Sequence, residues 1–245
     1  MATMTIHREA SRVLFACVCL MAFAPAWGEA IRVAVPPLAN LLERDNSGVY
    51  QRLVGRALEP LDYSVEQVFY PYRRSFKAFE QGRVDCIFSL GAILKKRLGA
   101  ERIVQSYPLG KFVFYVFMPS GEAPIESVDE LNDRVVGGII GHEVYLRPVL
   151  GENHGLEQVR SEKQAIRMLE LGRIDAFIAA MPDIRPFLDR LSYSPEHPLL
   201  QNFDRLNCHN TERNRDFIRD LSAELKKLKE AGGYREEAGD LYMPF

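Results

Sequence analysis

Short hydrophobic runs alternate along the chain with segments of helical periodicity. Continuous or alternating apolar runs predict β-strands, and apolar residues three or four positions apart predict helices. Strands are expected at residues 31–35, 64–70, 112–118, 135–140 and 204–208. Helices are expected at residues 49–58 and over the amphipathic stretch 217–228. This alternation is typical of α/β proteins with mostly parallel sheets.

A ten-residue pattern occurs twice, at Phe79–Phe88 and at Leu169–Ile178. Glutamate, glycine, arginine and aspartate occupy the same positions in both copies, and most other positions are apolar in both. Each copy predicts a helix end, a glycine in the left-handed conformation and a buried strand. We therefore expect two similar α/β lobes, with a ligand cleft between them that closes by a hinge motion.

The N-terminal segment has the pattern of a secretory signal peptide. A basic stretch at residues 7–12 precedes an uncharged apolar run at 13–24, and small residues follow. The run has 12 residues, whereas a membrane-spanning helix needs about 20. We expect removal of residues 1–28 and export to the periplasm, with cleavage after Ala26 as the alternative. Lipid attachment at Cys17 is not expected, because the apolar run continues past that residue.

Composition narrows the classes of function. The 245 residues are 47% hydrophobic and 26% charged, as in folded globular proteins, and suffice for one large domain or two small ones. The formal net charge of −2 gives no indication of nucleic acid or an anionic membrane as a partner. After signal-peptide removal two cysteines remain, Cys86 and Cys208. An oxidising compartment favours one disulfide between them, and two buried free thiols are the alternative.

The sequence contains no recognisable catalytic or metal-binding signature. Its histidines lack metal-ligand spacing, and it has no Gly-x-Ser-x-Gly, P-loop or Gly-x-Gly-x-x-Gly motif. We expect the acidic residues of the repeated pattern to be structural: Glu80, Asp85, Glu170 and Asp175. A binding protein without a cofactor or a metal is therefore expected rather than an enzyme.

Taken together, these features resemble the periplasmic solute-binding proteins of the amino-acid type (family 3, type II fold). The resemblance rests on the order and spacing of motifs over the whole mature chain: residues 31–35, 82–85, 97–108, 127–131, 141–143, 172–176 and 232–234. It implies an α/β fold with two lobes, two crossovers and a ligand cleft between the lobes. Lobe 1 would comprise residues 29–117 and 204–245, and lobe 2 residues 118–203.

The resemblance also implies positions for ligand contacts. Arg97 matches the arginine that binds the ligand carboxylate in relatives, where guanidinium makes two hydrogen bonds. Arg102 is a competing candidate, and Leu94 stands where relatives have a hydroxyl residue. The position of the aspartate that pairs with the ligand ammonium is Ala180 here, and Asp183 follows three residues later.

Other candidate ligand-binding residues follow predicted strand ends. Tyr70 ends the second expected strand, and Tyr72 and Arg73 follow it, where aromatic faces can bury an organic ligand and Arg73 can pair with an acid. An Arg73 stacked on a tyrosine at the surface is the alternative. Ser89 and Gly91 close the third strand and offer a hydroxyl and a backbone contact.

Gly141 and His142 begin a predicted helix, whose free N–H groups favour anions. We expect a monomeric periplasmic protein that captures a small, polar, carboxylate-bearing and amino-acid-like ligand for an ABC importer. A ligand-sensing receptor that acts with a membrane sensor and a cyclohexadienyl-dehydratase-like enzyme are the alternatives. The topology implied by the resemblance also places the strand of Cys208 beside that of Cys86.

Overall fold

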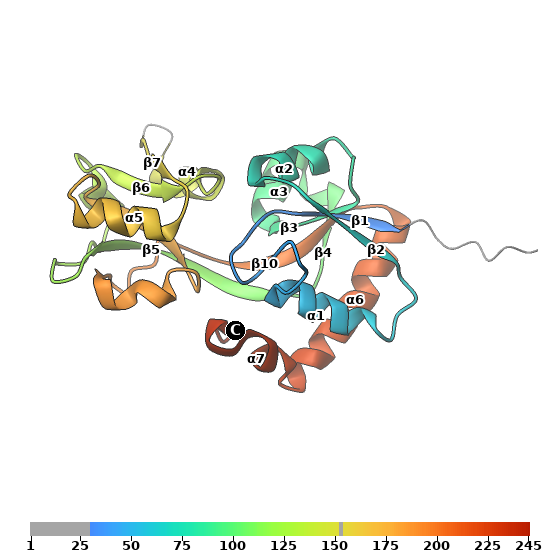
Figure 1. Ribbon diagram of the computed structural model, residues 1–245. Helices are drawn as coiled ribbons and strands as arrows, with labels where there is room; N and C mark the ends of the chain where they lie inside the picture. The colour runs from blue at the N-terminus through green and yellow to red at the C-terminus, as the bar shows by residue number, and fades with distance from the viewer. Residues whose placement is uncertain (1–29, 152–153) are drawn as a thin grey trace, which may run out of the picture.

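The computed structural model describes residues 30–151 and 154–245, which form two α/β lobes joined by two long strands (Figure 1). The predicted signal peptide lies outside these residues. In the described part of the chain, no helix combines the length and apolar character needed to cross a bilayer. The mixed α/β, two-lobe architecture expected from the sequence is confirmed.

Lobe 1 contains the first four strands, and its elements are β1 (Ile31–Val35), α1 (Val49–Leu58), β2 (Val65–Phe69), α2 (Tyr72–Glu80), β3 (Cys86–Leu90), α3 (Gly91–Leu98), η1 (Ala100–Arg102) and β4 (Ile103–Gln105). After lobe 2 the chain returns to lobe 1 and adds α6 (Glu212–Glu230), α7 (Gly233–Ala238) and η4 (Gly239–Leu241). The strand expected at 31–35 and the helix expected at 49–58 are confirmed at those bounds.

Lobe 2 lies between two long connecting strands, β5 (Gly110–Pro119) and β10 (Leu200–His209). Its elements are η2 (Val128–Leu131), β6 (Val136–Ile139), α4 (Glu143–Leu150), β7 (Glu157–Val159), α5 (Glu162–Glu170), β8 (Ala176–Met181), η3 (Arg185–Arg190) and β9 (Leu191–Ser192). The strands share one curled sheet in the order β2-β1-β3-β10-β5-β8-β6-β7, with β4 paired to β10 and β9 to β5. Pairing is parallel at both ends of the sheet and antiparallel around β5 and β10.

The connecting strands are hydrogen-bonded to each other, from Leu200 opposite Phe114 to Asp204 opposite Gly110. The sequence places the first crossover after residue 117, but residues 113–117 already pair with β8 of lobe 2. The lobes therefore meet inside a paired ribbon of two continuous strands. The boundaries given from the sequence stay predictions.

Helices cover both faces of the lobe 1 sheet, because successive strand side chains point to opposite faces. On one face Phe76 and Phe79 of α2 pack against the sheet, in a hydrophobic cluster that continues into lobe 2. On the other face Leu53 of α1 and Phe217 of α6 pack over Val33 in a second cluster. A third cluster lies under α5 in lobe 2.

The repeated sequence pattern forms the same junction in both lobes. Gly82 and Gly172 end α2 and α5 with φ values of 66° and 62°, which a residue without a Cβ adopts readily. The following aspartates each accept a backbone hydrogen bond from a neighbouring segment: Asp85 Oδ2 from Arg32 N of β1 at 2.8 Å, and Asp175 Oδ2 from the N–H of Val135, just before β6, at 2.7 Å. These acidic residues therefore have the structural role expected for them.

Replacing Asp85 by Ala is expected to lower the free energy of unfolding by about 1–2 kcal/mol, because it leaves the partly buried N–H of Arg32 without its partner. The matched Asp175→Ala variant should lose less free energy of unfolding, because the hydrogen bond that Asp175 accepts is exposed and water can replace it. Urea denaturation of both variants measures the difference. Equal losses would contradict this account of the junction.

Cys86 of β3 lies directly opposite Cys208 of β10, and the two residues form a disulfide. Their separation along the chain is 122 residues, so the bridge closes a loop that contains all of lobe 2. Both cysteines are fully buried in the second hydrophobic cluster. The bridge fixes the returning strand to lobe 1 and does not itself connect the two lobes.

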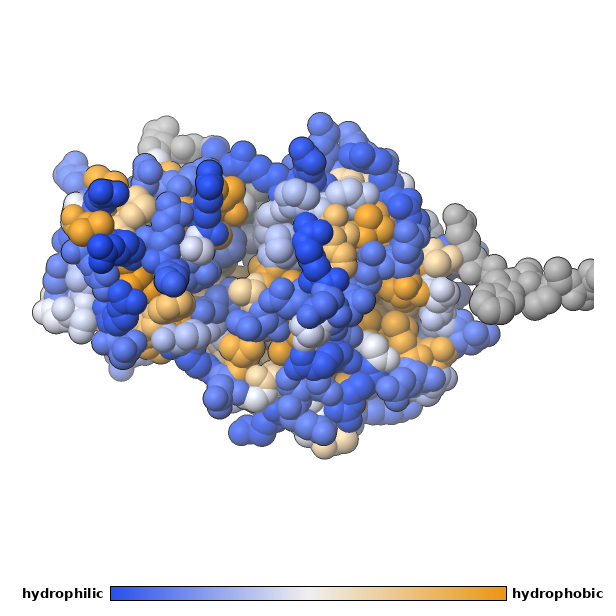
Figure 2. Space-filling view, in the orientation of Figure 1, coloured by the Kyte–Doolittle hydropathy of each residue, from blue (hydrophilic) through white to orange (hydrophobic). Residues whose placement is uncertain are grey.

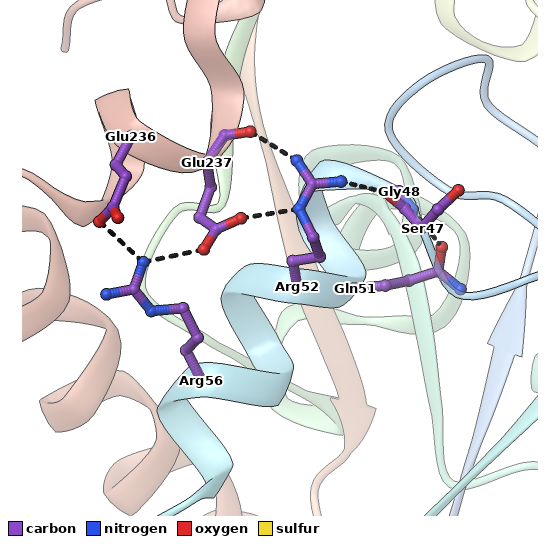
Figure 3. Close-up of polar contacts among 7 residues, drawn as sticks. All are labelled: Ser47, Gly48, Gln51, Arg52, Arg56, Glu236 and Glu237. Atoms are coloured by element: carbon purple, nitrogen blue, oxygen red, sulfur yellow. Dashed lines mark hydrogen bonds and ion pairs between the residues drawn. The ribbon is translucent and has the colours of Figure 1, made fainter.

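The C-terminal helix α7 is attached to α1 by a network of ion pairs (Figure 3). Arg52 Nε lies 2.7 Å from Glu237 Oε2, and Arg56 Nη1 lies 2.8 Å from Glu237 Oε1 and 2.9 Å from Glu236 Oε2. The hydrogen bonds from Arg52 and Arg56 hold the pKa of Glu237 below its usual value. Partly exposed pairs of this kind contribute little stability individually, and the network chiefly positions α7.

Candidate functional site

A pocket lies where the two lobes and the connecting strands meet, with about 360 Å³ of empty space including its open mouth. Lobe 1 contributes Leu38 and Leu41, from the loop after β1, and Tyr72 from the start of α2. Hydrophilic side chains cover most of the visible surface, and hydrophobic residues are exposed between them, including where the lobes meet (Figure 2). The pocket lining thus combines residues of lobe 1, lobe 2 and the connecting strands, which are far apart in the sequence.

Aromatic rings form much of the pocket wall. Phe112 and Phe114 point to the same face of β5, since they are two residues apart in a strand, and their ring centroids lie 5.5 Å apart. His142 and Tyr145 come from the N-terminal turn of α4, and the His142 ring lies 5.4 Å from that of Phe114. Tyr72 completes the wall from lobe 1, 5.9 Å from Tyr145.

Two carboxyl groups also line the pocket. Asp204 lies on the connecting strand β10, and the Tyr50 hydroxyl donates a hydrogen bond to its Oδ2 at 2.8 Å. Burial raises the pKa of Asp204 to about 7, and the bond from Tyr50 opposes that rise. Asp183 follows β8, beside Ala180 and Pro182 of the lining. Burial, with repulsion from Glu162 and Asp204, raises the pKa of Asp183 to about 8.

His142 is a buried polar side chain with unused hydrogen-bonding capacity. It is 6% exposed, and among the described residues its Nδ1 has no hydrogen-bond partner. Burial lowers the pKa of His142 to about 4, and the nearby charge of Glu143 opposes this. The ring is therefore neutral at pH 7. Among the described residues that line the pocket, none is lysine or arginine.

Two of the residues expected from the sequence, Tyr72 and His142, line this pocket. Arg97 instead lies in an ion pair with Glu80, at 2.6 Å, and outside the lining of this pocket. It borders a second depression, of about 810 Å³ including its open mouth, which Tyr72 and Arg73 of lobe 1 and Gly141 of lobe 2 also border. Arg97 as a ligand anchor stays a prediction, and the described conformation places it outside the lining of the first pocket.

Arg73 forms an ion pair that crosses from lobe 1 to lobe 2, with its Nε 2.9 Å from Glu143 Oε1. The second oxygen of Glu143 accepts a hydrogen bond from Gly141 N at 2.6 Å. The hydroxyls of Tyr72 and Tyr145 are also in contact across the cleft. Gly141 has a φ of 99°, and a Cβ there would lie 2.9 Å from the Tyr72 ring. The first turns of α2 and α4 therefore hold the lobes together.

The other expected residues lie away from the pocket lining. Tyr70 packs against the cluster shared by both lobes, and Ser89 is buried with its hydroxyl unpartnered among the described residues. Gly91 starts α3 so close to Gln105 that a Cβ would lie 1.4 Å from its Nε2. Arg102 is exposed, with Glu101 as an ion-pair partner at 3.9 Å.

Sequence reasoning missed the acidic residue on the connecting strand and most of the aromatic wall. Asp204 is an acid inside a strand, between Phe203 and Arg205, and this interruption of an otherwise strand-like run was the available signal. The pairing of Phe112 and Phe114 on one face was visible as strand alternation. Their closeness to Tyr145 depends on tertiary structure. The described residues contain no group of three or more metal-ligating side chains that could hold an ion.

No protein-family model matches the sequence, and no curated protein matches it. Several solved structures share the fold. The GluR0 ligand-binding core from Nostoc punctiforme, in complex with L-glutamate, has a TM-score of 0.68 at 16% identity, covering 87% of this chain and all of that one. An amino acid ABC transporter substrate-binding protein from Streptococcus pneumoniae, bound to L-arginine, has a TM-score of 0.63 at 15% identity. The match covers 87% of this chain and 96% of that one.

A third structure is an ancestral amino acid-binding protein described as a precursor of cyclohexadienyl dehydratase. It has a TM-score of 0.66 at 15% identity and covers 87% of this chain and 95% of that one. At these identities the likeness establishes the fold. This chain therefore has the two-lobe fold of the periplasmic binding proteins of type II, as expected from the resemblance in sequence.

Proposed function

We propose that this protein binds a small solute in the pocket between its lobes. The observation that carries the proposal is the origin of the lining, which comes from lobe 1, from lobe 2 and from both connecting strands. A solute held there contacts both lobes at once, so its binding favours the closed arrangement over an open one. The binding proteins that share the fold support this role.

The proposal extends to the setting in which the protein acts. A monomer exported to the periplasm would hand its solute to the permease of an ABC importer, and the transporter protein among the structural neighbours supports this. The ligand-binding core among them supports the alternative of a receptor that acts with a membrane sensor. Permease and ATPase genes beside this gene would favour import, whereas a kinase or cyclase gene would favour sensing.

A dehydratase-like activity is a second candidate. Asp183 and Asp204 have pKa values raised to about 8 and 7, so a carboxyl group in the pocket can carry a proton at neutral pH and donate it to a leaving group. The fold shared with a dehydratase precursor also supports it. Assays for turnover of prephenate and arogenate test this candidate directly.

An Ala180→Phe variant is expected to lose solute binding, because Ala180 lines the pocket and the added ring would fill it. The ring is also expected to cost about 1–3 kcal/mol of stability, which leaves the protein folded. Leu38→Trp, in the loop after β1, blocks the same pocket from the other lobe. A thermal-shift screen of amino acids, amines, organic acids and sugars, followed by X-ray scattering, measures binding and compaction.

The exposed Ala100→Phe variant is the matched control, since it adds the same ring outside the pocket. It should bind like the wild type. A solute that raises the melting temperature equally in Ala180→Phe, Leu38→Trp and the control would show that binding occurs elsewhere. Wild-type protein that responds to no compound of any class would contradict the proposed function itself.

A further inference from the structure

We propose that the pocket between the lobes selects an organic cation, a compound with a protonated amine on an apolar body and no carboxylate. This inference rests on the proposed function and names the class of its ligand. It departs from the carboxylate-bearing ligand expected from the sequence. Four features of the pocket carry it.

The first feature is the balance of charge in the lining. Asp183 and Asp204 come from different elements, one after β8 and one on β10, and both are partly accessible to the pocket. The described lining residues include no lysine or arginine, and His142 is neutral at pH 7. An ammonium group therefore meets two carboxyl groups that can ionise beside it and no fixed positive charge, whereas a carboxylate meets no positive partner.

The second feature is the position of the nearby arginines. Arg97 is paired with Glu80 and Arg73 with Glu143, and both pairs lie outside the lining of this pocket. An acidic ligand that recruited either one would have to break an existing ion pair. Tyr72 borders both the pocket and the depression where these arginines lie, so its ring stands between the two hollows.

The third feature is the aromatic wall. Tyr72, Phe112, Phe114 and Tyr145 present rings to one small pocket, and such rings attract cations through their negative faces. The same rings cover the apolar body of a ligand. An apolar amine uses both properties, because its charged end meets carboxylates and rings while its body displaces water from apolar surface.

The fourth feature is the unused nitrogen of His142. This side chain is more than nine-tenths buried, lines the pocket and has no described partner for Nδ1. A buried polar atom without a partner is costly, and a ligand that donates a hydrogen bond would satisfy it. In the tautomer that carries the proton on Nε2, the neutral imidazole accepts such a bond at Nδ1 from an ammonium group and adds no repulsion.

Binding of a cation would also exchange protons with the solvent. The titratable groups facing the two carboxyls are Tyr50 of α1, Tyr72 of α2, His142 and Tyr145 of α4, and Glu162 of α5. None of these is cationic at pH 7, so the empty pocket favours protonated carboxyls. A bound ammonium favours the ionised forms, and protons leave to water as it enters. Affinity should therefore rise between pH 6 and pH 8.

The test uses two series of compounds in which only the charged groups change. Phenethylamine, phenylalanine and 3-phenylpropionate share one apolar body, and pentylamine, norleucine and hexanoate share another. Isothermal titration calorimetry with the full mature protein at pH 6 and pH 8 gives affinity and proton release. The amine of at least one series should bind ten or more times tighter than its zwitterion at pH 8, and the acids should not bind.

The variants Asp183→Asn and Asp204→Asn keep the shape of the pocket and remove one counter-charge each. Each should weaken amine binding at least tenfold and reduce the dependence on pH. Asp189→Asn is the matched control, because Asp189 is exposed on η3 near the pocket segment and outside the lining. Circular dichroism checks that all three variants are folded.

The outcomes separate this inference from the proposed function. Tighter binding of phenylalanine or an acid than of the matching amine overturns the cation inference and leaves solute binding intact, above all if Arg97→Ala abolishes it. Amine binding that survives both Asn variants also overturns the inference. If no amine binds at millimolar concentration while another solute causes compaction, the cation inference fails alone. If no solute of any class binds, both proposals fail.

Discussion

At pH 8 and without ligand, an Asp183→Asn variant is expected to melt several degrees above the wild type. The folded-state pKa of Asp183 is about 8, against 3.8 for an unperturbed carboxyl, so the folded protein holds a proton that the unfolded chain releases. The contribution of the neutral carboxyl to stability is fully present below pH 3.8 and is lost as the pH rises to about 8. Asparagine does not titrate, so the variant avoids this loss.

The size of the effect follows from the shift in pKa. Each pKa unit corresponds to about 1.4 kcal/mol, so the full shift sets an upper limit of several kcal/mol. The side chain is partly accessible to water in the pocket, and we expect about 2 kcal/mol, or roughly 5 °C in melting temperature. The difference from the wild type should shrink as the pH falls and vanish near pH 4.

Differential scanning calorimetry from pH 4 to pH 8 measures this dependence. Asp189→Asn, an exposed change of the same kind, should follow the wild type at every pH. The groups that share the environment of Asp183 are Glu162, Asp204 and Tyr50, whose charges interact with it. A variant that is less stable than the wild type at pH 8 would show that Asp183 is held ionised by a partner, contrary to this account.

Removing the disulfide is expected to cost more than any other substitution considered. A Cys86→Ala/Cys208→Ala variant frees the unfolded chain from a cross-link that spans 122 residues. The chain-entropy treatment gives about 4–5 kcal/mol for a loop of this length, which corresponds to about 10 °C or more in melting temperature. Urea denaturation of the variant and the wild type without reductant measures the loss.

Each single variant, Cys86→Ala or Cys208→Ala, should lose nearly as much free energy of unfolding as the double variant. Removal of one sulfur already abolishes the cross-link. Solute binding should survive where the protein remains folded, since neither cysteine lines the pocket. Mass spectrometry of non-reduced peptides checks the bridge itself. Free thiols at both positions, or a melting temperature unchanged in the double variant, would rule out this account.

Much of the fold was predictable because its signals are local. The helix at 49–58 has an apolar face in its own sequence, and the repeated junction has a glycine at the place where the chain needs a positive φ. Repetition alone predicts a structural role for Asp85 and Asp175, and each accepts a backbone hydrogen bond that ties its junction to a neighbouring segment. Such features depend on neighbours a few residues away or on a pattern that occurs twice.

The candidate site was less predictable because its parts meet only after folding. Asp204 and Tyr50 are 154 residues apart, and neither carries a sequence signal of the other. Arg97 illustrates the opposite case, in which a motif fixes the residue type but not the direction of its side chain. The resemblance gives it a ligand-binding position, which stays a prediction, and in the described conformation it pairs with Glu80 outside the pocket lining. The ion pair with Glu80 depends on tertiary structure, which one sequence does not reveal.

The floor of the pocket is part of the ribbon formed by β5 and β10. Phe112 and Phe114 on one strand and Asp204 on the other would therefore hold a solute in the proposed pocket against the two strands that join the lobes. A rotation of the lobes about these two strands would therefore move the walls of the pocket only a little. A displacement of a fraction of an ångström at the pocket grows in proportion to distance along the lobe. The outer edges, at β2 on one side and β7 on the other, would move the furthest.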